Sequence, residues 1–401
     1  MTKQYDITII GGGIVGLSTA YKILEQKPDI KLLILEKEPG VAMHQTGNNS
    51  GVIHSGIYYR PGSLRALNCI NGYKQLLEFS DREGIPYELC GKIIVATDQN
   101  EKAILKTVYD RGIQNGLDKI RMISVEEMKE KEPHVFGVEA IDVPYAGIID
   151  FKVVANTLAQ IVTERQGGEI LLNQKVLNIY THSGYSEVIT DSEVFSTKLV
   201  INTAGLHSDE IGALTTPKLD LRIIPFRGEY MTIKKDREYL CRNLIYPTPD
   251  PDFPWLGVHF TRMIKGVVEA GPNAVWAFKK EGYKMSDVSL KDMGKALGFP
   301  GFQKAMFKFM GFGIGEYYRS LNKAAFTKGL QKLIPEIRKE DLLPGDTGVR
   351  ALAVGRNGEL LDDFVFAENE WAVNVLNAPS PAATACLSIG DSVAEKALAR
   401  F

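Results

Sequence analysis

The chain has 401 residues, long enough for one large domain or two interleaved domains with a sizeable apolar core. Its 47 lysines and arginines nearly balance 49 aspartates and glutamates, and a formal net charge of -2 gives no reason to expect nucleic acid or another polyanion as a partner. The four cysteines, Cys69, Cys90, Cys241 and Cys386, lack CxxC spacing, so they predict neither a metal site nor a disulfide framework.

The N-terminal residues run directly into an apolar segment without the pattern of a signal peptide, which predicts a cytoplasmic protein. Residues 5–24 then join a strand pattern to a helical pattern through "GGGIVG", which places Gly11, Gly13 and Gly16 in the order GxGxxG. A second apolar run ends in Glu36, about 20 residues after Gly16. Strand, glycines, helix, strand and acid within about 30 residues predict a dinucleotide site.

Each part of this unit has a physical task. Gly11 makes the tight turn, Gly13 lets a pyrophosphate approach the backbone, and Gly16 lets the helix pack closely on the strand. The helix N-terminus offers N–H groups and the positive end of its dipole to the phosphates. The Glu36 carboxylate can accept hydrogen bonds from both hydroxyls of a ribose.

The next segment, residues 44–59, reads "HQTGNNSGVIHSGIYY", and its polar, glycine-rich first half is typical of a loop. A nicotinamide enzyme usually continues into further βαβ units, whereas here a long helical pattern, residues 63–83, follows the loop. The sequence contains no second GxGxxG. We therefore predict FAD as the cofactor, with the first half of the loop against FAD and the second half against the substrate.

The middle of the chain alternates helical and strand patterns. Residues 150–166 have helical periodicity, and "VINTAG", residues 200–205, is predicted to end a strand with its backbone close to the ligand. From residue 218 to about 345 the sequence turns to hairpin and then helical patterns, with residues 247–254 as a rigid, proline-rich loop. Substrate contacts are expected to concentrate in this part.

Two helical patterns in the second half of the chain bear on function. In residues 299–318, Phe302, Met306 and Phe309 share one face, a pattern that fits either a core-facing helix or a helix on a membrane surface. The last helix is predicted to begin at Ser380 and Pro381 and to direct its N-terminus at the flavin.

Nine segments, in order from residue 5 to about 390, together resemble the L-2-hydroxyglutarate dehydrogenase/oxidase family, a branch of the D-amino-acid-oxidase-like flavoproteins. They are "GGGIVG", "LEKE", "HQTGNNSGVIHSGIYY", "PGSL", "PFRGEY", "YPTPDP", "LGVHFTR", "GPNAV" and "NAPSPAAT". The resemblance implies FAD, hydride transfer from C2 of L-2-hydroxyglutarate to flavin N5 to give 2-oxoglutarate, and passage of electrons on to a quinone or to oxygen. It leaves open a peripheral contact with the inner face of the cell membrane.

The resemblance also implies an α/β fold with two interleaved domains. A Rossmann-like FAD-binding domain, assembled from discontinuous segments, is expected over residues 1–84, 145–217 and 346–401. A second, α+β substrate domain built on an antiparallel sheet is expected over residues 85–144 and 218–345. The residues expected to contact FAD are Gly11, Gly13, Gly16, Glu36, Lys37, His44, Thr46, Asn49, Ser50, Gly51, Val176, Ala204, Gly205, Ser380, Pro381 and Ala382. A covalent link between His44 and the flavin is left open.

Oxidation of a 2-hydroxy acid needs a base for the hydroxyl proton and groups that hold the carboxylates. His54 and His259 stand in motifs of the family and are the two candidate bases; we expect the His54 imidazole to keep a pKa near its unperturbed value of about 6.5. Arg227 and Arg350 are the candidate carboxylate ligands, because a planar guanidinium can hold a carboxylate bidentately. Either arginine could instead pair with a nearby acid, such as Glu229 or Glu359.

Two other functions compete with this prediction. An amine oxidase of the same superfamily would act on glycine, sarcosine or a D-amino acid and would release ammonia or methylamine. A flavin-containing binding or sensor protein would hold the cofactor without turnover. The sequence favours oxidation of a 2-hydroxy dicarboxylate over both.

Overall fold

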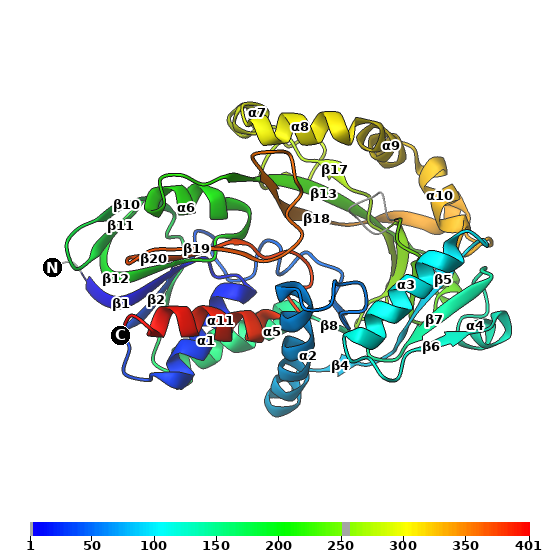
Figure 1. The fold of residues 1–401 in the computed structure, drawn as a ribbon, viewed down its shortest axis with the longest axis horizontal. Coiled ribbons are helices and arrows are strands. Elements are labelled where there is room, and N and C mark those ends of the chain that lie inside the picture. The colour runs from blue at the N-terminus through cyan, green and yellow to red at the C-terminus, as the bar shows by residue number, and fades with distance from the viewer. Residues whose placement is uncertain (1–2, 251–256) are drawn as a thin grey trace.

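The computed structural model describes residues 3–250 and 257–401 of the chain. Figure 1 shows two groups of elements, one around each of two large sheets, with long strands passing between them. Both chain ends lie in the first group. The predicted rigid loop, residues 247–254, falls partly outside the described residues.

The first sheet has parallel strands at its centre. β1 and β2 pair in parallel with Ile7 opposite Leu32, and β12 lies on the other side of β1 with Leu199 opposite Ile7. β2 and the second half of β1 are fully buried, as expected for apolar strands covered on both faces. The strands of this sheet are β1 (Lys3–Ile10), β2 (Leu32–Leu35), β9 (Glu169–Leu171), β10 (Val176–Thr181), β11 (Ser186–Thr190), β12 (Val194–Asn202), β19 (Val365–Glu368) and β20 (Ala372–Asn377).

Helices pack on this sheet through small and apolar residues. α1 (Ile14–Gln26) and α11 (Cys386–Leu398) make close contact, and a Cβ added at Gly390 would lie 2.7 Å from Ser18 O. α2 (Leu64–Glu83) begins at an N-cap, Ser63, whose side chain accepts from Ala66 N, and ends at Gly84 with a φ of 67°. The remaining helices near this sheet are α5 (Phe151–Gln160), the π-helical η1 (Ile161–Arg165), the 3-10 turn η2 (Gly205–His207) and α6 (Ser208–Thr215).

The second sheet is mostly antiparallel, as predicted. The exception is β14, which pairs in parallel with β5 at Ile245 and Ile93. The strands are β5 (Lys92–Ala96), β6 (Arg121–Ile123), β7 (Glu139–Val143), β13 (Leu221–Ile233), β14 (Leu244–Pro247), β15 (His259–Arg262), β16 (Val268–Gly271), β17 (Val275–Trp276) and β18 (Leu342–Gly355).

Helices cover this sheet and extend along one outer side of the molecule (Figure 1). They are α3 (Glu101–Gln114), α4 (Val125–Lys131), the 3-10 helix η3 (Lys235–Leu240), α7 (Leu290–Leu297), α8 (Pro300–Lys308), α9 (Met310–Leu321), α10 (Lys323–Gln331) and the 3-10 turn η4 (Lys339–Asp341). The single helical pattern at residues 299–318 thus becomes two helices that meet at Phe309. Among the described residues, no helix has both the length and the apolar character to cross a bilayer.

A small third sheet fixes the end of the predicted cofactor loop. β3 (Val52–Ile53) pairs with β8 (Gly147–Ile149), which also pairs with β4 (Tyr87–Glu88). Val52 and Ile53 are buried, so the chain leaves the loop at a fixed position directly before His54.

The strands of the two large sheets can be compared with the expected domain bounds. The expected division at residue 346 falls inside β18, which pairs with β13 over its length and belongs to the second sheet. We retain the two-domain division as a proposal.

Candidate active site

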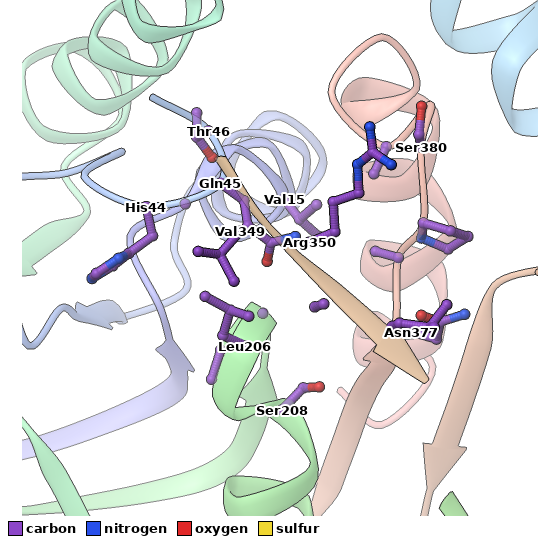
Figure 2. Close-up of a pocket in the computed structure, with 18 of the residues that line it drawn as sticks. Val15, His44, Gln45, Thr46, Leu206, Ser208, Val349, Arg350, Asn377 and Ser380 are labelled. Atoms are coloured by element: carbon purple, nitrogen blue, oxygen red, sulfur yellow. The ribbon is translucent and has the colours of Figure 1, made fainter. Parts of the chain in front are cut away.

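A cavity of about 1880 Å³ lies among the loops that join the two sheets. Figure 2 shows Gln45 and Thr46 from the loop after β2, Leu206 from η2, Ser208 from the start of α6, and Val349 and Arg350 from β18 around it. Its lining includes Gly11, Gly13, Glu36, Lys37, His44, Thr46, Asn49, Ser50, His54, Val176, Ala204, Gly205, His259, Arg350, Ser380, Pro381 and Ala382. Most residues predicted to bind cofactor or substrate therefore share one cavity.

The glycines of the GxGxxG motif have the close contacts that their predicted tasks require. Gly11 has a φ of 112°, and a Cβ there would lie 2.7 Å from Thr203 O. A Cβ at Gly16 would lie 2.1 Å from Gly11 O, so Gly16 serves helix packing and does not line the cavity. Gly13 is the N-cap of α1 and lines the cavity, where a phosphate could approach the backbone.

Glu36 lies at the end of β2 and organises the backbone around the motif. Its Oε2 accepts from Gly12 N at 2.7 Å, and its Oε1 accepts from Glu38 N at 2.9 Å. The carboxylate is buried and lines the cavity, so its remaining lone pairs are available to a ribose.

His44 and Lys37 belong to a network of charges beside Glu36. His44 Nδ1 lies 3.0 Å from Tyr283 Oη, and Nε2 lies 3.0 Å from both Lys37 Nζ and Glu38 Oε1. Both ring nitrogens thus have protein partners. Against the effect of burial, hydrogen bonds from His207 and Lys37 hold the pKa of Glu281 well below its usual range.

Three residues of this network, Glu38, His44 and Glu281, place ligand atoms within 4.8 Å of one another, as in a metal site. Lys37 Nζ lies among them, 2.6 Å from Glu281 Oε1 and also bonded to Glu38. An ammonium group therefore occupies the position that a metal ion would take.

The predicted cofactor loop is shaped by its own polar side chains. Thr46 Oγ1 accepts from Ile14 N at 3.0 Å and so satisfies the first amide of α1. Asn49 donates to the backbone carbonyls of Gln45 and Thr46 and accepts from Gly51 N. Asn49 thus holds the loop in shape while lining the cavity, and Gly51, with a φ of 62°, lies outside the lining.

The last helix begins later than predicted. α11 starts at Cys386, not at Ser380 and Pro381. Pro379 and Pro381 fix the chain in a turn, closed by hydrogen bonds from Ala382 N to Pro379 O and from Ala385 N to Pro381 O. This turn, and not a helix terminus, lines the cavity at residues 380–382.

His54 and His259 line the same part of the cavity. His259 Nδ1 lies 2.9 Å from Gly257 O, so Nδ1 carries the hydrogen and Nε2 keeps its lone pair. The Tyr246 ring packs on His259 with centroids 4.0 Å apart. His54 follows β3, and its backbone N donates to Thr384 Oγ1 at 3.1 Å, which ties it to the turn before α11.

The expectation of an unperturbed His54 pKa is wrong. Burial, with the positive charges of Lys92 and Arg65, lowers the pKa of His54 to about 3. Burial also lowers the pKa of His259 to about 3, against the opposing effect of its hydrogen bond to Gly257. Both imidazoles of the cavity without ligand are therefore neutral near pH 7, and each keeps a lone pair that can accept a hydrogen bond.

The two predicted arginines lie in different environments. Arg350 pairs with Phe226 across β18 and β13, whereas Arg227 pairs with Val349, so side-chain alternation sends the two guanidinium groups to opposite faces. Arg350 lines the cavity, and no described carboxylate lies within salt-bridge distance of it. The alternative pairing with Glu359 is not formed.

Arg227 takes the alternative that the sequence left open. Its Nε donates to Glu229 Oε1 at 3.1 Å, and its Nη1 donates to Lys284 O at 3.2 Å. The residue is 1% exposed and is not part of the cavity lining. The structure thus assigns Arg227 to the support of β13, because its hydrogen bonds are directed into the protein.

Several cavity residues were missed by sequence reasoning. Tyr230 and Tyr246 line the cavity near the two histidines, as does Tyr58 from the second half of the predicted cofactor loop, which was expected against the substrate. Arg65, on α2, donates to Ser380 O and stacks on Tyr59 at 4.4 Å. For Tyr230 and Tyr246, membership of the motifs "PFRGEY" and "YPTPDP" was the only indication available.

Lys92, next to the cavity, was also missed by sequence reasoning. It is 2% exposed, and its Nζ lies 4.7 Å from the ring centroids of both Tyr58 and Tyr246. The salt bridges of the described residues do not include it. Burial lowers the pKa of Lys92 to about 7.

The residues fit a dinucleotide together with a small substrate. The cavity exceeds the roughly 300–1,000 Å³ typical of a single drug-sized ligand. One end has the glycine backbone and the Glu36 carboxylate, and the other end has the two histidines, the tyrosines and Arg350. A long cofactor could extend from the first end and leave the second for substrate.

A protein-family comparison agrees with this arrangement. The family described as "DAO: FAD dependent oxidoreductase" matches residues 6–396. The chain belongs to this family. The predictions of a flavoprotein fold, an FAD cofactor and an enzyme are therefore confirmed.

Curated relatives place the flavoprotein in a narrower group. It is 54% identical over 399 residues to an L-2-hydroxyglutarate dehydrogenase of Indibacter alkaliphilus, covering 99% of this chain and 100% of the relative. It is 43% identical over 417 residues to the mitochondrial L-2-hydroxyglutarate dehydrogenase of Homo sapiens, covering 100% of this chain and 90% of the relative. The predicted family resemblance is thereby confirmed.

Solved structures support the same fold. An L-alpha-glycerophosphate oxidase from Mycoplasma pneumoniae, solved in dithionite-reduced form with FAD bound, matches with a TM-score of 0.81 and 25% identity over 99% of this chain and 95% of that one. A glycine oxidase from Geobacillus kaustophilus matches with a TM-score of 0.74 at 14% identity over 100% and 96% of the two chains. The second likeness shows the fold alone.

Proposed function

We propose that this flavoprotein oxidises L-2-hydroxyglutarate, or a close 2-hydroxy dicarboxylate, to the 2-oxo acid. The observation that carries the proposal is the composition of one end of the cavity. Two neutral histidines there stand beside Arg350, a cation without a carboxylate partner among the described residues. The names of the curated relatives point to the same substrate.

Positive charge at this end favours a dianionic substrate. Arg350 offers a planar fork for one carboxylate, and its charge also acts on Tyr230 and His259. Lys92 adds a second cation behind Tyr58 and Tyr246. The nearby hydroxyls of Tyr58 and Tyr246 can donate to carboxylate oxygens, because burial raises the pKa of each phenol.

Oxidation of the 2-hydroxyl group needs separate acceptors for the hydroxyl proton and for the hydride from C2. FAD, when bound, supplies an acceptor for the hydride from C2. We assign the hydroxyl proton to the His54 imidazole, which lines the cavity and follows the rigid strand β3, because the negative charge of a bound dicarboxylate raises the pKa of a neighbouring imidazole. His259, held at Nδ1 by Gly257 O, presents Nε2 as a hydrogen-bond acceptor that can orient the same hydroxyl.

We further propose that the electrons pass on to a quinone or to oxygen and that the protein makes a peripheral contact with a membrane. The reaction leaves a reduced cofactor that a second substrate must reoxidise. Oxygen consumption, compared with reduction of a soluble quinone analogue under argon, distinguishes the two acceptors.

A substrate panel with a dye acceptor tests the proposed activity. We expect turnover with L-2-hydroxyglutarate, weak or no turnover with its D enantiomer, and none with glycine, sarcosine or D-amino acids. Release of ammonia or methylamine from the amino compounds would instead support an amine oxidase. A flavin that no member of the panel reduces would support a protein without turnover.

A further inference from the structure

The outer face of α9 is apolar, although it faces water. Phe307 lies near the end of α8, and Met310, Ile314, Tyr318 and Leu321 recur in α9 at intervals of three and four residues, so these four lie along one side of α9. The exposed fractions of the five residues, in this order, are 71%, 54%, 64%, 60% and 74%. We call these five residues the α9 stripe. A surface helix of a globular protein normally turns such a face toward the core.

The inner face of α9 is polar, and its contacts fix the rotation of the helix. Glu316 is buried, and its Oε2 accepts from Ala274 N at 3.0 Å. Tyr317 Oη donates to Trp276 O at 2.6 Å, and Ser320 Oγ donates to Glu229. Because these hydrogen bonds tie α9 to the second sheet, the α9 stripe stays on the outside.

Basic residues accompany the stripe. Residues 300–332 contain only one acid, Glu316, which is buried and paired with Arg319. Figure 1 shows α8, α9 and α10 together on one outer side of the molecule, away from both chain ends. The basic residues of this segment are Lys304, Lys308, Arg319, Lys323, Lys328 and Lys332.

We propose that the α9 stripe docks on the surface of an anionic phospholipid bilayer. Exposed aromatic and aliphatic side chains insert at the level of the headgroups, while lysines beside them reach the phosphates. Charge complementarity selects this occupant, because an apolar stripe bordered by cations and without an exposed acid matches an anionic lipid surface. The α9 stripe would thus be the surface that makes the membrane contact proposed above. This assignment rests on that contact but does not depend on the identity of the substrate.

The position of this face also suits a lipophilic electron acceptor. The cavity lining extends to Lys308 and Phe309, directly between α8 and α9. Docking through the α9 stripe thus brings this end of the cavity toward the bilayer, where a quinone dissolves.

Vesicle flotation of the full-length holoenzyme tests the proposal. The protein is mixed with vesicles of phosphatidylcholine, or of phosphatidylcholine with phosphatidylglycerol, at low and at high salt. We expect flotation with the anionic vesicles, weakened by salt. The double variant Ile314→Ser and Leu321→Ser should lower the partition coefficient about tenfold or more.

Two further variants separate the contributions. Lys304→Gln with Lys328→Gln should weaken binding to the anionic vesicles and reduce its salt dependence. A matched control, Phe136→Ser with Tyr180→Ser, removes two apolar side chains that are 51% and 50% exposed and lie outside the cavity lining, and it should float like the parent. All variants should keep turnover with a soluble dye acceptor.

Three results would overturn the docking proposal. The parent remains unbound with both kinds of vesicle, or the Ile314→Ser and Leu321→Ser variant floats as well as the parent. Alternatively, sedimentation shows a dimer that this variant dissociates, which makes a second copy the occupant of the stripe. Normal flotation by an enzyme that oxidises no 2-hydroxy acid would contradict only the proposed function.

Discussion

At the scale of single residues, the proposed mechanism depends on His54 and His259, whose neutral imidazoles lie at one end of the cavity. The proton-transfer step can therefore be tested by substituting one histidine at a time. Substitution of His54 by alanine removes the proposed base. We expect anaerobic flavin reduction to slow by roughly 10²- to 10⁴-fold, the usual range for loss of a general base. The visible FAD spectrum should stay intact, because the FAD contacts of the loop precede β3. Stopped-flow absorbance of the flavin measures both.

The matched control is His259→Ala. It removes the imidazole whose Nδ1 is held by Gly257 O, and we expect a smaller loss of rate from it. If His259→Ala shows the larger loss and His54→Ala reduces flavin at nearly the parent rate, the base has been assigned to the wrong histidine.

Arg350 is expected to determine affinity for the substrate carboxylate. Arg350→Met removes charge-assisted hydrogen bonds worth about 1.5–3 kcal/mol, so kcat/KM for the dicarboxylate should fall roughly 10- to 100-fold. Arg350→Lys keeps the charge without the planar fork and should fall in between. An unchanged kcat/KM in Arg350→Met, measured with a dye acceptor, would remove this arginine from the site.

We expect the ionisation of Lys92 to determine how kcat/KM depends on pH. With the pKa of Lys92 lowered by burial to about 7, its ammonium is lost as the pH rises through that value, and attraction of a dianion is lost with it. We expect kcat/KM to fall as pH rises through about 7 and the fall to disappear in Lys92→Met. The histidines, with a pKa of about 3, add no acid limb above pH 5. A limb near pH 6.5 in both proteins would contradict this account.

At the scale of residues, sequence reasoning located groups whose tasks follow from a local motif. Gly11 and Glu36 stand in one βαβ unit, so their spacing alone brings them together. The sequence could not predict the histidine pKa values, because these depend on burial and on Lys92, which comes from another strand.

Arg227 shows how strand register decides a role. Its position opposite Val349 directs its side chain to Glu229 and Lys284, away from Arg350. The motif "PFRGEY" identifies Arg227 as a candidate, but it does not show which strand pairs with it. The register between β13 and β18, which begin more than a hundred residues apart, could not be predicted from the sequence.

Removal of Arg227 should therefore affect stability more than substrate binding. Arg227→Met leaves Glu229 without its cation, and we expect a loss of about 3 kcal/mol in the free energy of unfolding. The double variant Arg227→Met and Glu229→Gln should recover part of this loss, because it leaves no unpaired carboxylate. Urea denaturation measures both. A large rise in KM at unchanged stability would return Arg227 to the substrate site.

At the scale of elements, the helices also show that local sequence patterns do not predict features that depend on tertiary contacts. Periodicity predicted the helix at residues 63–83 well, since Ser63 caps α2 and Gly84 ends it. It did not predict the turn before α11. It also did not predict the break at Phe309, after which the apolar side of α9 faces outward. These features depend on tertiary hydrogen bonds, such as those of Glu316 and Tyr317.

At the scale of the whole molecule, the cavity exists because two sheets are built from interleaved segments. The dinucleotide motif reaches it from β1 and β2, whereas Arg350 and His259 reach it from β18 and β15 of the second sheet. The family resemblance predicted this interleaving. Local patterns could not, because no pattern shows which distant strands pair.

The most direct test of the account is anaerobic titration of the oxidised holoenzyme with L-2-hydroxyglutarate, followed by the loss of flavin absorbance. We predict complete bleaching with the formation of one 2-oxoglutarate per flavin, and little bleaching with the D enantiomer at the same concentration. A flavin that stays oxidised with L-2-hydroxyglutarate, but bleaches with glycine, sarcosine or a D-amino acid, would contradict the account.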